Sequence, residues 1–249
     1  MKVACVLFGQ PRDYMTGYNT ITKYFKDQSG VEVEYFYHCW TLNEGESYCT
    51  SPWREDINPN TLIYDNNTEE HIKSLYNPVS YEYENQSKVF FDITPLIRTV
   101  PFRNTYEQQI DNIDNTLHQL YSRNRVRNLL DKYIEDTKIE YDYVLFTRFD
   151  IDKIPKLDLS KIDKSIMYVQ DAEHHHGYFK DYVFFIPTNV FLRVFDVFDK
   201  LKDIVEDPQL IYKMKSLEQH IEINPESLFY AKYHLEFDNL DKVKFIDPN

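Results

Sequence analysis

Short apolar runs of strand length alternate with longer amphipathic segments along most of the chain. Apolar runs predict strands over 2–8, 31–40, 61–65, 79–84, 165–169 and 182–186, and a further buried strand within 141–152. Apolar residues at helical spacing predict helices over 13–28, 68–76, 106–137, 187–205 and 225–235. Strands and helices in this order are typical of an α/β fold, here with a mixed, mainly parallel sheet and helices on both faces.

The longest helical segment, 106–137, carries an irregularity. Its apolar stripe shifts phase between Tyr121 and Val126, so a bend or two successive helices are expected there. The same stretch holds a basic cluster, 121–127, in an otherwise acidic chain. Such a cluster is usually a solvated helix face, and the alternative is that Arg123 reaches a diphosphate.

The mid-chain strand ends in two carboxylates that are one residue apart, Asp150 and Asp152, with Arg148 just before them. Side chains alternate faces in an extended chain, so we expect these three to project the same way. Oxygen ligands at a strand's carboxyl end suit Mg²⁺ or Mn²⁺ together with substrate phosphates. The alternative is an ordinary solvated turn in a chain rich in aspartate.

The first two strands also end in candidate binding residues. The first runs into Gly9-Gln10-Pro11-Arg12, a turn that permits close backbone approach and places Arg12 to meet a phosphate or base. The second ends near Trp40, which either stacks on a base or sugar or belongs to the core.

The last hundred residues add acidic and histidine candidates. Three consecutive histidines, His174 to His176, predict an active-site loop with one participating ring, and Asp181 follows them. Asn224-Pro225-Glu226 is typical of a helix start, where Glu226 is either a partner of the helix dipole or an acid near the substrate. His234, near the end of that helix, is a candidate third metal ligand.

Composition narrows the function classes. A net charge of −13 argues against a general binder of nucleic acid or anionic membranes. It also means that binding a phosphate substrate needs a local positive charge, from a bound cation or arginine side chains. The chain has 3 cysteines without zinc-site spacing, which favours a reducing compartment. We find no signal peptide and no apolar stretch long enough for a membrane span, so a cytoplasmic protein is expected.

Three short motifs together carry a family likeness. They are Phe8-Gly9-Gln10-Pro11-Arg12, His38-x-Trp40 and Tyr141-Asp142-Tyr143-Val144-x-x-x-Arg148-x-Asp150-x-Asp152. In this combination the chain resembles small GT-A-fold glycosyltransferases, of the kind that act in bacterial capsule synthesis and in glycan synthesis by large DNA viruses. Asp181 before a strand and Pro225-Glu226 at a helix start fit the same layout. The resemblance spans nearly the whole chain, although residues 41–105 add little to it.

The resemblance implies a GT-A (nucleotide-diphospho-sugar transferase) fold and an enzyme that transfers a sugar. The whole chain, 1–249, would be one catalytic domain, with a nucleotide-binding half over 1–150, an irregular insertion at 41–105 and an acceptor-side half over 151–249. The donor would be a nucleotide-diphosphate sugar, with uridine diphosphate ahead of guanosine diphosphate. The acceptor would be a glycan or another hydroxyl compound.

The resemblance also assigns residues to roles. Asp150 and Asp152 match the family's Asp-x-Asp, whose Mn²⁺ or Mg²⁺ bridges the diphosphate. Arg148 stands where many such motifs carry an acidic residue, so it is open whether one or both aspartates touch metal. The nucleotide-sugar site would be lined by Phe8, Gly9, Gln10, Arg12, Trp40, Arg123 and Arg148. If the reaction inverts the sugar, a carboxylate must act as general base, with Asp181 the first candidate and Glu226 the second.

Three other functions compete with this one. A haloacid-dehalogenase-type phosphatase also places Asp-x-Asp after an apolar strand, but usually near the chain start and followed by a small residue or threonine. A nucleotide- or carbohydrate-binding module without catalysis is a second alternative. A sugar nucleotidyltransferase normally opens with a glycine-rich loop and a lysine, which Gly9-Gln10-Pro11-Arg12 lacks.

Overall fold

The structure is a computed structural model that describes most of the chain. The described residues are 1–48, 63–65, 67–92, 106–170, 179, 183–216, 224–237 and 240–246, of which 106–112 and 215 are described without side chains. Residues 49–62, 66 and 93–105 of the predicted insertion 41–105 lie outside these ranges, as do His174 to His176 and Asp181. Within the described ranges, no helix combines the length and the apolar character that crossing a membrane requires.

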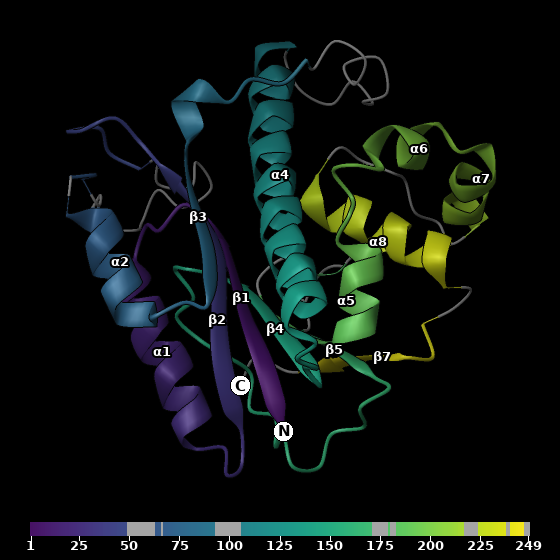
Figure 1. Cartoon of the computed structure of the whole chain (residues 1–249). Helices are drawn as coiled ribbons and strands as arrows, with labels where there is room; N and C mark the ends of the chain where they lie inside the picture. Colours follow the sequence, from purple (N-terminus) through teal and green to yellow (C-terminus); the bar gives the residue numbers. More distant parts are fainter. Residues whose placement is uncertain are drawn as a thin grey trace.

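A sheet of 7 strands, in the order β3-β2-β1-β4-β6-β5-β7, forms the centre of the molecule (Figure 1). The strands are β1 (Lys2–Gly9), β2 (Glu32–Thr41), β3 (Ser80–Asn85), β4 (Tyr143–Arg148), β5 (Met167–Gln170), β6 (Val183–Pro187) and β7 (Val243–Ile246). β6 runs antiparallel to its neighbours β4 and β5, and every other pairing is parallel. The predicted mixed, mainly parallel sheet is confirmed.

Helices cover both faces of this sheet, as predicted. α1 (Tyr14–Lys26) and α2 (Thr68–Tyr76) lie on one side, and α4 (Tyr106–Thr137), α5 (Thr188–Val194) and α8 (Pro225–Glu236) on the other (Figure 1). α6 (Leu201–Glu206) and α7 (Pro208–Ser216) pack on α8, and a 3₁₀ turn, η1 (Gln86–Lys88), follows β3.

The strands bury both faces, which explains their nearly continuous apolar sequence. In β1, Val3, Cys5 and Leu7 belong to the core shared with α1 and α2. The alternate residues Ala4, Val6 and Phe8 belong to the core shared with α4, α5 and α8. β4 and β6 divide their side chains in the same way, so residue parity decides which layer a side chain enters.

The predicted alternative of two successive helices was wrong, because α4 is one uninterrupted helix. The apolar stripe breaks where Ser122, Arg123 and Asn124 take buried positions on the helix. Ser122 contacts Gly9 and His38, and Arg123 lies over the Phe8 ring, so the ends of β1 and β2 enclose these two side chains. The phase shift marks a buried polar patch that includes Arg123, whereas Arg125 of the same basic cluster keeps a side chain that is 39% exposed and pairs with Glu82.

The predicted helix 187–205 is also divided. α5 ends at Val194, and α6 starts at Leu201. Between them, Phe195 packs on Phe146, with ring centroids 4.4 Å apart, while Phe198 reaches Tyr121 of α4 at 5.3 Å. A continuous helix would carry these two rings along one stripe, so the break allows each to fill a different gap.

Candidate functional site

The carboxyl ends of β1 and β4 form the edge of the sheet where this topology favours a ligand. β2 and β3 lie on one side of β1 and β4 lies on the other, so the strand order reverses between β1 and β4. Open α/β sheets bind ligands outside the carboxyl ends of the strands at such a reversal. Phe8 and Arg148 are register partners there, so the turn after β1 and the segment after β4 leave the sheet side by side.

Arg148 and Asp150 form a two-pronged ion pair at this edge. Arg148 donates from Nε to Asp150 Oδ1 at 2.8 Å and from Nη2 to Oδ2 at 2.5 Å. Burial raises the pKa of Asp150, but the charge of Arg148, its hydrogen bonds and the nearby charge of Arg12 outweigh burial, so the pKa lies below its ordinary value. Asp150 is therefore ionised and both of its oxygens are engaged.

Asp152 does not join this pair. Its side chain is exposed, and α1 meets its backbone instead, where Thr20 Oγ1 donates to the Asp152 carbonyl at 3.4 Å. Across the described ranges, no group of at least three histidine, cysteine, aspartate or glutamate side chains is placed to hold a metal ion. The described residues thus do not fit a site in which Asp150, Asp152 and His234 share Mn²⁺ or Mg²⁺. A cation held through Asp152 stays a prediction.

The turn after β1 is fixed by hydrogen bonds from two directions. Gly9 has φ +93°, a conformation that favours glycine, and its N–H donates to Ser122 Oγ of α4 at 2.9 Å. Gln10 Nε2 donates to Gln86 Oε1 at 2.7 Å, and Arg12 Nε donates to Gln10 Oε1 at 3.0 Å. These bonds connect Arg12 to α4 and to the end of β3.

A buried histidine continues the network behind this turn. His38 Nδ1 lies 2.8 Å from Ser122 Oγ, and His38 Nε2 lies 3.2 Å from Glu84 Oε2. Burial lowers the pKa of His38, although the hydrogen bond to Glu84 opposes the shift. A neutral ring with its proton on Nε2 satisfies both ring nitrogens, because Nε2–H donates to Glu84 and Nδ1 accepts from the Ser122 hydroxyl, whose oxygen accepts from Gly9 N–H.

Three predicted nucleotide-binding residues lie inside the protein near this edge. Arg123 is 3% exposed, and its guanidinium lies 4.7 Å from the Phe8 ring centroid. Phe8 also stacks on Phe146 with centroids 4.5 Å apart. Trp40 is 2% exposed and stacks on Tyr121 at 5.6 Å. Protein atoms cover these three side chains, which pack beneath the strand ends. Their contact with a ligand stays a prediction.

The remaining candidates lie on α8. Glu226 is half-buried in its first turn, where Asn224 caps the helix by accepting from Ser227 N–H at 2.7 Å. His234 lies in the last turn, where its ring meets Tyr230 at 4.6 Å. Burial lowers the pKa of His234. Lys213 of α7 donates to the His234 carbonyl at 3.0 Å, so the described contacts of His234 are with α7 and with its own helix.

Two residues that support the edge were not identified from the sequence. Ser122 reads as an ordinary polar helix residue, and only its burial against Gly9 shows what it does. Gly17 lies within α1, where a Cβ would come 1.7 Å from the Phe149 carbonyl oxygen. The helix backbone therefore packs directly on the turn that carries Asp150. A glycine inside an amphipathic helix pattern is the one signal that sequence offered.

Comparison with known proteins finds no family model that matches the chain and no curated protein of detectably similar sequence.

Proposed function

We propose that the protein is a glycosyltransferase that moves a sugar from a nucleotide-diphosphate donor to a hydroxyl acceptor. One observation carries the proposal: the Arg148–Asp150 pair and the Gly9–Arg12 turn lie side by side where the strand order reverses. This is where an open α/β sheet binds nucleotides, and guanidinium groups suit the donor's phosphates. The mixed sheet, the helices on both faces and the three GT-A-like motifs support the same proposal.

The reaction needs charge at the leaving group and a base at the acceptor. The bond between sugar C1 and the diphosphate oxygen breaks with its electron pair on the diphosphate, and the acceptor oxygen bonds to C1. If the reaction inverts the sugar, the acceptor proton passes to a carboxylate, for which Asp181 is the first candidate and Glu226 the second. Arg12 and Arg148 would stabilise the negative charge that develops on the diphosphate.

The phosphatase alternative requires a different use of Asp150. Its carboxylate would attack phosphorus, which needs an oxygen open to the substrate. Both oxygens accept hydrogen bonds from Arg148, so this arrangement disfavours a nucleophilic role. The non-catalytic binding module uses the same edge as the transferase, and the difference between them is turnover.

The first test is thermal unfolding with the diphosphates of uridine, guanosine, adenosine, cytidine and thymidine, each with Mn²⁺ and with EDTA. A nucleotide present at about a hundred times its Kd should add about 2.7 kcal/mol to the free energy of unfolding. Release of that nucleoside diphosphate from its sugar conjugates, stimulated by one of a panel of sugar acceptors, would establish transfer.

Three results would contradict the proposal. If no nucleotide stabilises the protein in either condition, the site does not bind a donor. Binding without turnover across the acceptor panel would indicate the binding module. Hydrolysis of small phosphate esters that is lost in Asp150→Asn would indicate the phosphatase.

A further inference from the structure

The Arg148–Asp150 pair joins residues only two positions apart in sequence. Arg148 uses its Nε and Nη2 edge to hold both carboxylate oxygens, a planar fork that fixes the direction of the guanidinium. The pair links no two elements of the fold, because both residues belong to the end of β4 and its turn. Its main structural effect is therefore to orient Arg148.

The charge around Asp150 favours an anion over a cation. Arg148 contacts the carboxylate, and the charge of Arg12 also acts on it. The described residues thus place two positive charges at Asp150, in a chain whose net charge is −13. A divalent cation at Asp150 would have to displace Arg148 and lie beside two positive charges. A diphosphate would meet the charge that it needs.

The surroundings hold this arrangement in place. α1 packs on the Phe149 carbonyl through Gly17, which fixes the turn that carries Asp150. Arg12 is held through Gln10, and the backbone of the same turn is held through Gly9 and Ser122. Both arginines therefore extend from backbone segments that are anchored before any ligand arrives, which reduces the ordering cost of binding.

We propose that Asp150 is a positioning residue for Arg148, and that Arg148 and Arg12 form a diphosphate-binding site that needs no divalent cation. This inference rests on the proposed glycosyltransferase function for the identity of its ligand, because the diphosphate would be that of the donor. It assigns Asp150 a role different from the metal ligand that the Asp-x-Asp motif implies.

The test is calorimetric titration of the whole protein with uridine diphosphate, guanosine diphosphate and inorganic pyrophosphate, each with Mn²⁺ and with EDTA. Wild-type affinity for pyrophosphate and for one nucleotide should agree within about twofold between the two conditions. Asp150→Asn and Arg148→Gln should each weaken binding about tenfold to a hundredfold, the usual effect of a lost hydrogen bond to a charged group. In EDTA, where no cation can act through Asp152, Asp152→Asn is the matched control from the same motif and should bind as wild type does.

Further variants separate positioning from general damage. Arg148→Lys keeps the charge but loses the planar fork, so it should also bind the diphosphates more weakly. Asp150→Asn should leave competition by the free nucleoside unchanged, whereas a merely structural role would weaken nucleoside and diphosphate together.

The outcomes distinguish the two proposals. Nucleotide binding that requires Mn²⁺, and is lost equally in Asp152→Asn and Asp150→Asn, would overturn the cation-independent site and leave the transferase standing. Pyrophosphate binding in EDTA without binding of either nucleotide would support the arginine site and count against the nucleotide donor. If none of the three probes binds in EDTA, the arginine site is overturned.

Discussion

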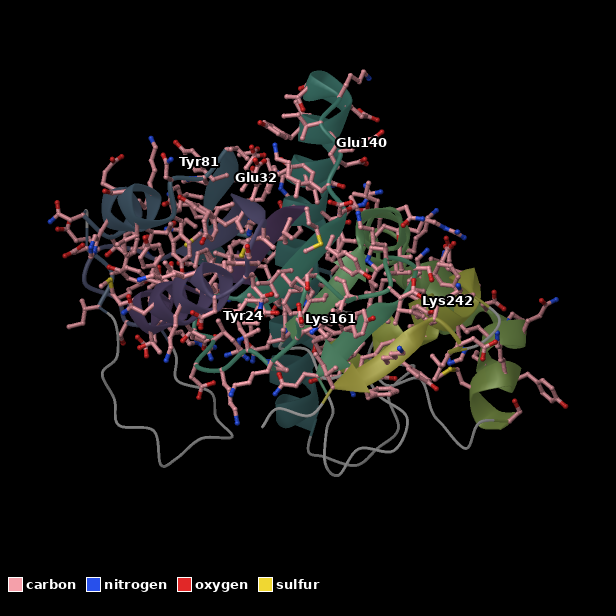
Figure 2. The ribbon with its side chains drawn as sticks, turned by 90° about the horizontal axis from the view of Figure 1, so that it is seen from below. Tyr24, Glu32, Tyr81, Glu140, Lys161 and Lys242 are labelled. Atoms are coloured by element: carbon pink, nitrogen blue, oxygen red, sulfur yellow. The ribbon has the colours of Figure 1, made fainter. Side chains whose placement is uncertain are left out.

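The two edges of the sheet both carry ion pairs, but the pairs do different things. At the amino edge, Lys2 pairs with Glu34 at 2.9 Å, and Asp142 accepts from the Lys2 N–H and pairs with Lys164. These bonds join β1 to β2, to the start of β4 and to the segment before β5. Figure 2 views the molecule from this side, with Glu32, Glu140 and Lys242 labelled next to strand starts.

At the carboxyl edge, the Arg148–Asp150 pair connects nothing beyond its own turn. Hydrogen bonds through Ser122, His38 and Glu84, and the bond between Gln10 and Gln86, join elements there and hold the turn after β1 in place. The difference teaches that the presence of ion pairs does not mark a site. What marks it is a charged pair within a single turn, placed at the carboxyl ends of the strands where the strand order reverses.

The prediction with the largest expected effect concerns the packing of α1 against the turn at the carboxyl edge. Gly17→Ala removes a helix-interior glycine, which alone would stabilise α1 by about 1 kcal/mol. The added Cβ would lie 1.7 Å from the Phe149 carbonyl oxygen, so we expect a net loss of about 3 kcal/mol in the free energy of unfolding. Urea unfolding measures it. Asn19→Ala, on the exposed side of the same helix, is the control and should change stability by less than about 0.5 kcal/mol. A stabilised Gly17→Ala protein would show that α1 does not pack on this turn.

The strength of the sequence argument differs between the fold and this edge. The strands at 2–8 and 31–40 and the helix at 68–76 were predicted closely, because their apolar spacing is set by burial on known faces. β7 at 243–246 was not predicted, because only 4 residues of mixed polarity form it. Short strands of this kind depend on a neighbour, here β5, which the local sequence does not show.

The sequence predicted which residues meet at the carboxyl edge but not which contacts they make with one another. Arg148, Asp150 and Arg12 do come together, because strand ends in parallel neighbours meet at one edge. The extended continuation that would have aligned Asp150 with Asp152 fails, because β4 stops at Arg148 and a turn follows. Which partner each charge chooses depends on side-chain geometry at that turn, and sequence spacing does not encode it.

Acid pH should lower the free energy of unfolding through the two edges in different pH ranges. This effect should be smaller than that of Gly17→Ala. The pKa of buried His38 is lowered, so below about pH 6.5 the unfolded chain takes up a proton that the folded protein does not. Stability therefore falls as the pH falls through that range, by at most about 1.4 kcal/mol per pH unit for this one group. At the amino edge, burial raises the pKa of Glu34, but its contacts with Tyr141 and Lys2 outweigh burial. The pKa therefore lies below its ordinary value. Its contribution is lost only below about pH 4.

Unfolding free energies between about pH 7 and pH 5 test the His38 assignment. His38→Gln should flatten this part of the profile. His234→Gln is the matched control, because burial lowers the pKa of His234 too, away from the strand ends, so each variant should remove only its own share of the slope. If the slope in His38→Gln is unchanged, His38 is already charged in the folded protein. Its Nδ1 could then not accept from the Ser122 hydroxyl, and the hydrogen bonds proposed for Ser122 and Gly9 would be wrong.

The smallest expected effect comes from the amino edge. Lys2→Met removes the pair with Glu34, in which both side chains are about a quarter exposed at 24% and 26%, together with a contact between Lys2 Nζ and the Tyr141 ring. Partly exposed pairs of this kind contribute about 0–1 kcal/mol, so the free energy of unfolding should fall by less than about 1 kcal/mol. Because this edge lies at the opposite ends of the strands, the affinity for nucleoside diphosphates should stay at the wild-type value, in contrast to Arg148→Gln. A loss of nucleotide affinity in Lys2→Met as large as in Arg148→Gln would mean that general charge, and not the geometry at the strand reversal, determines binding.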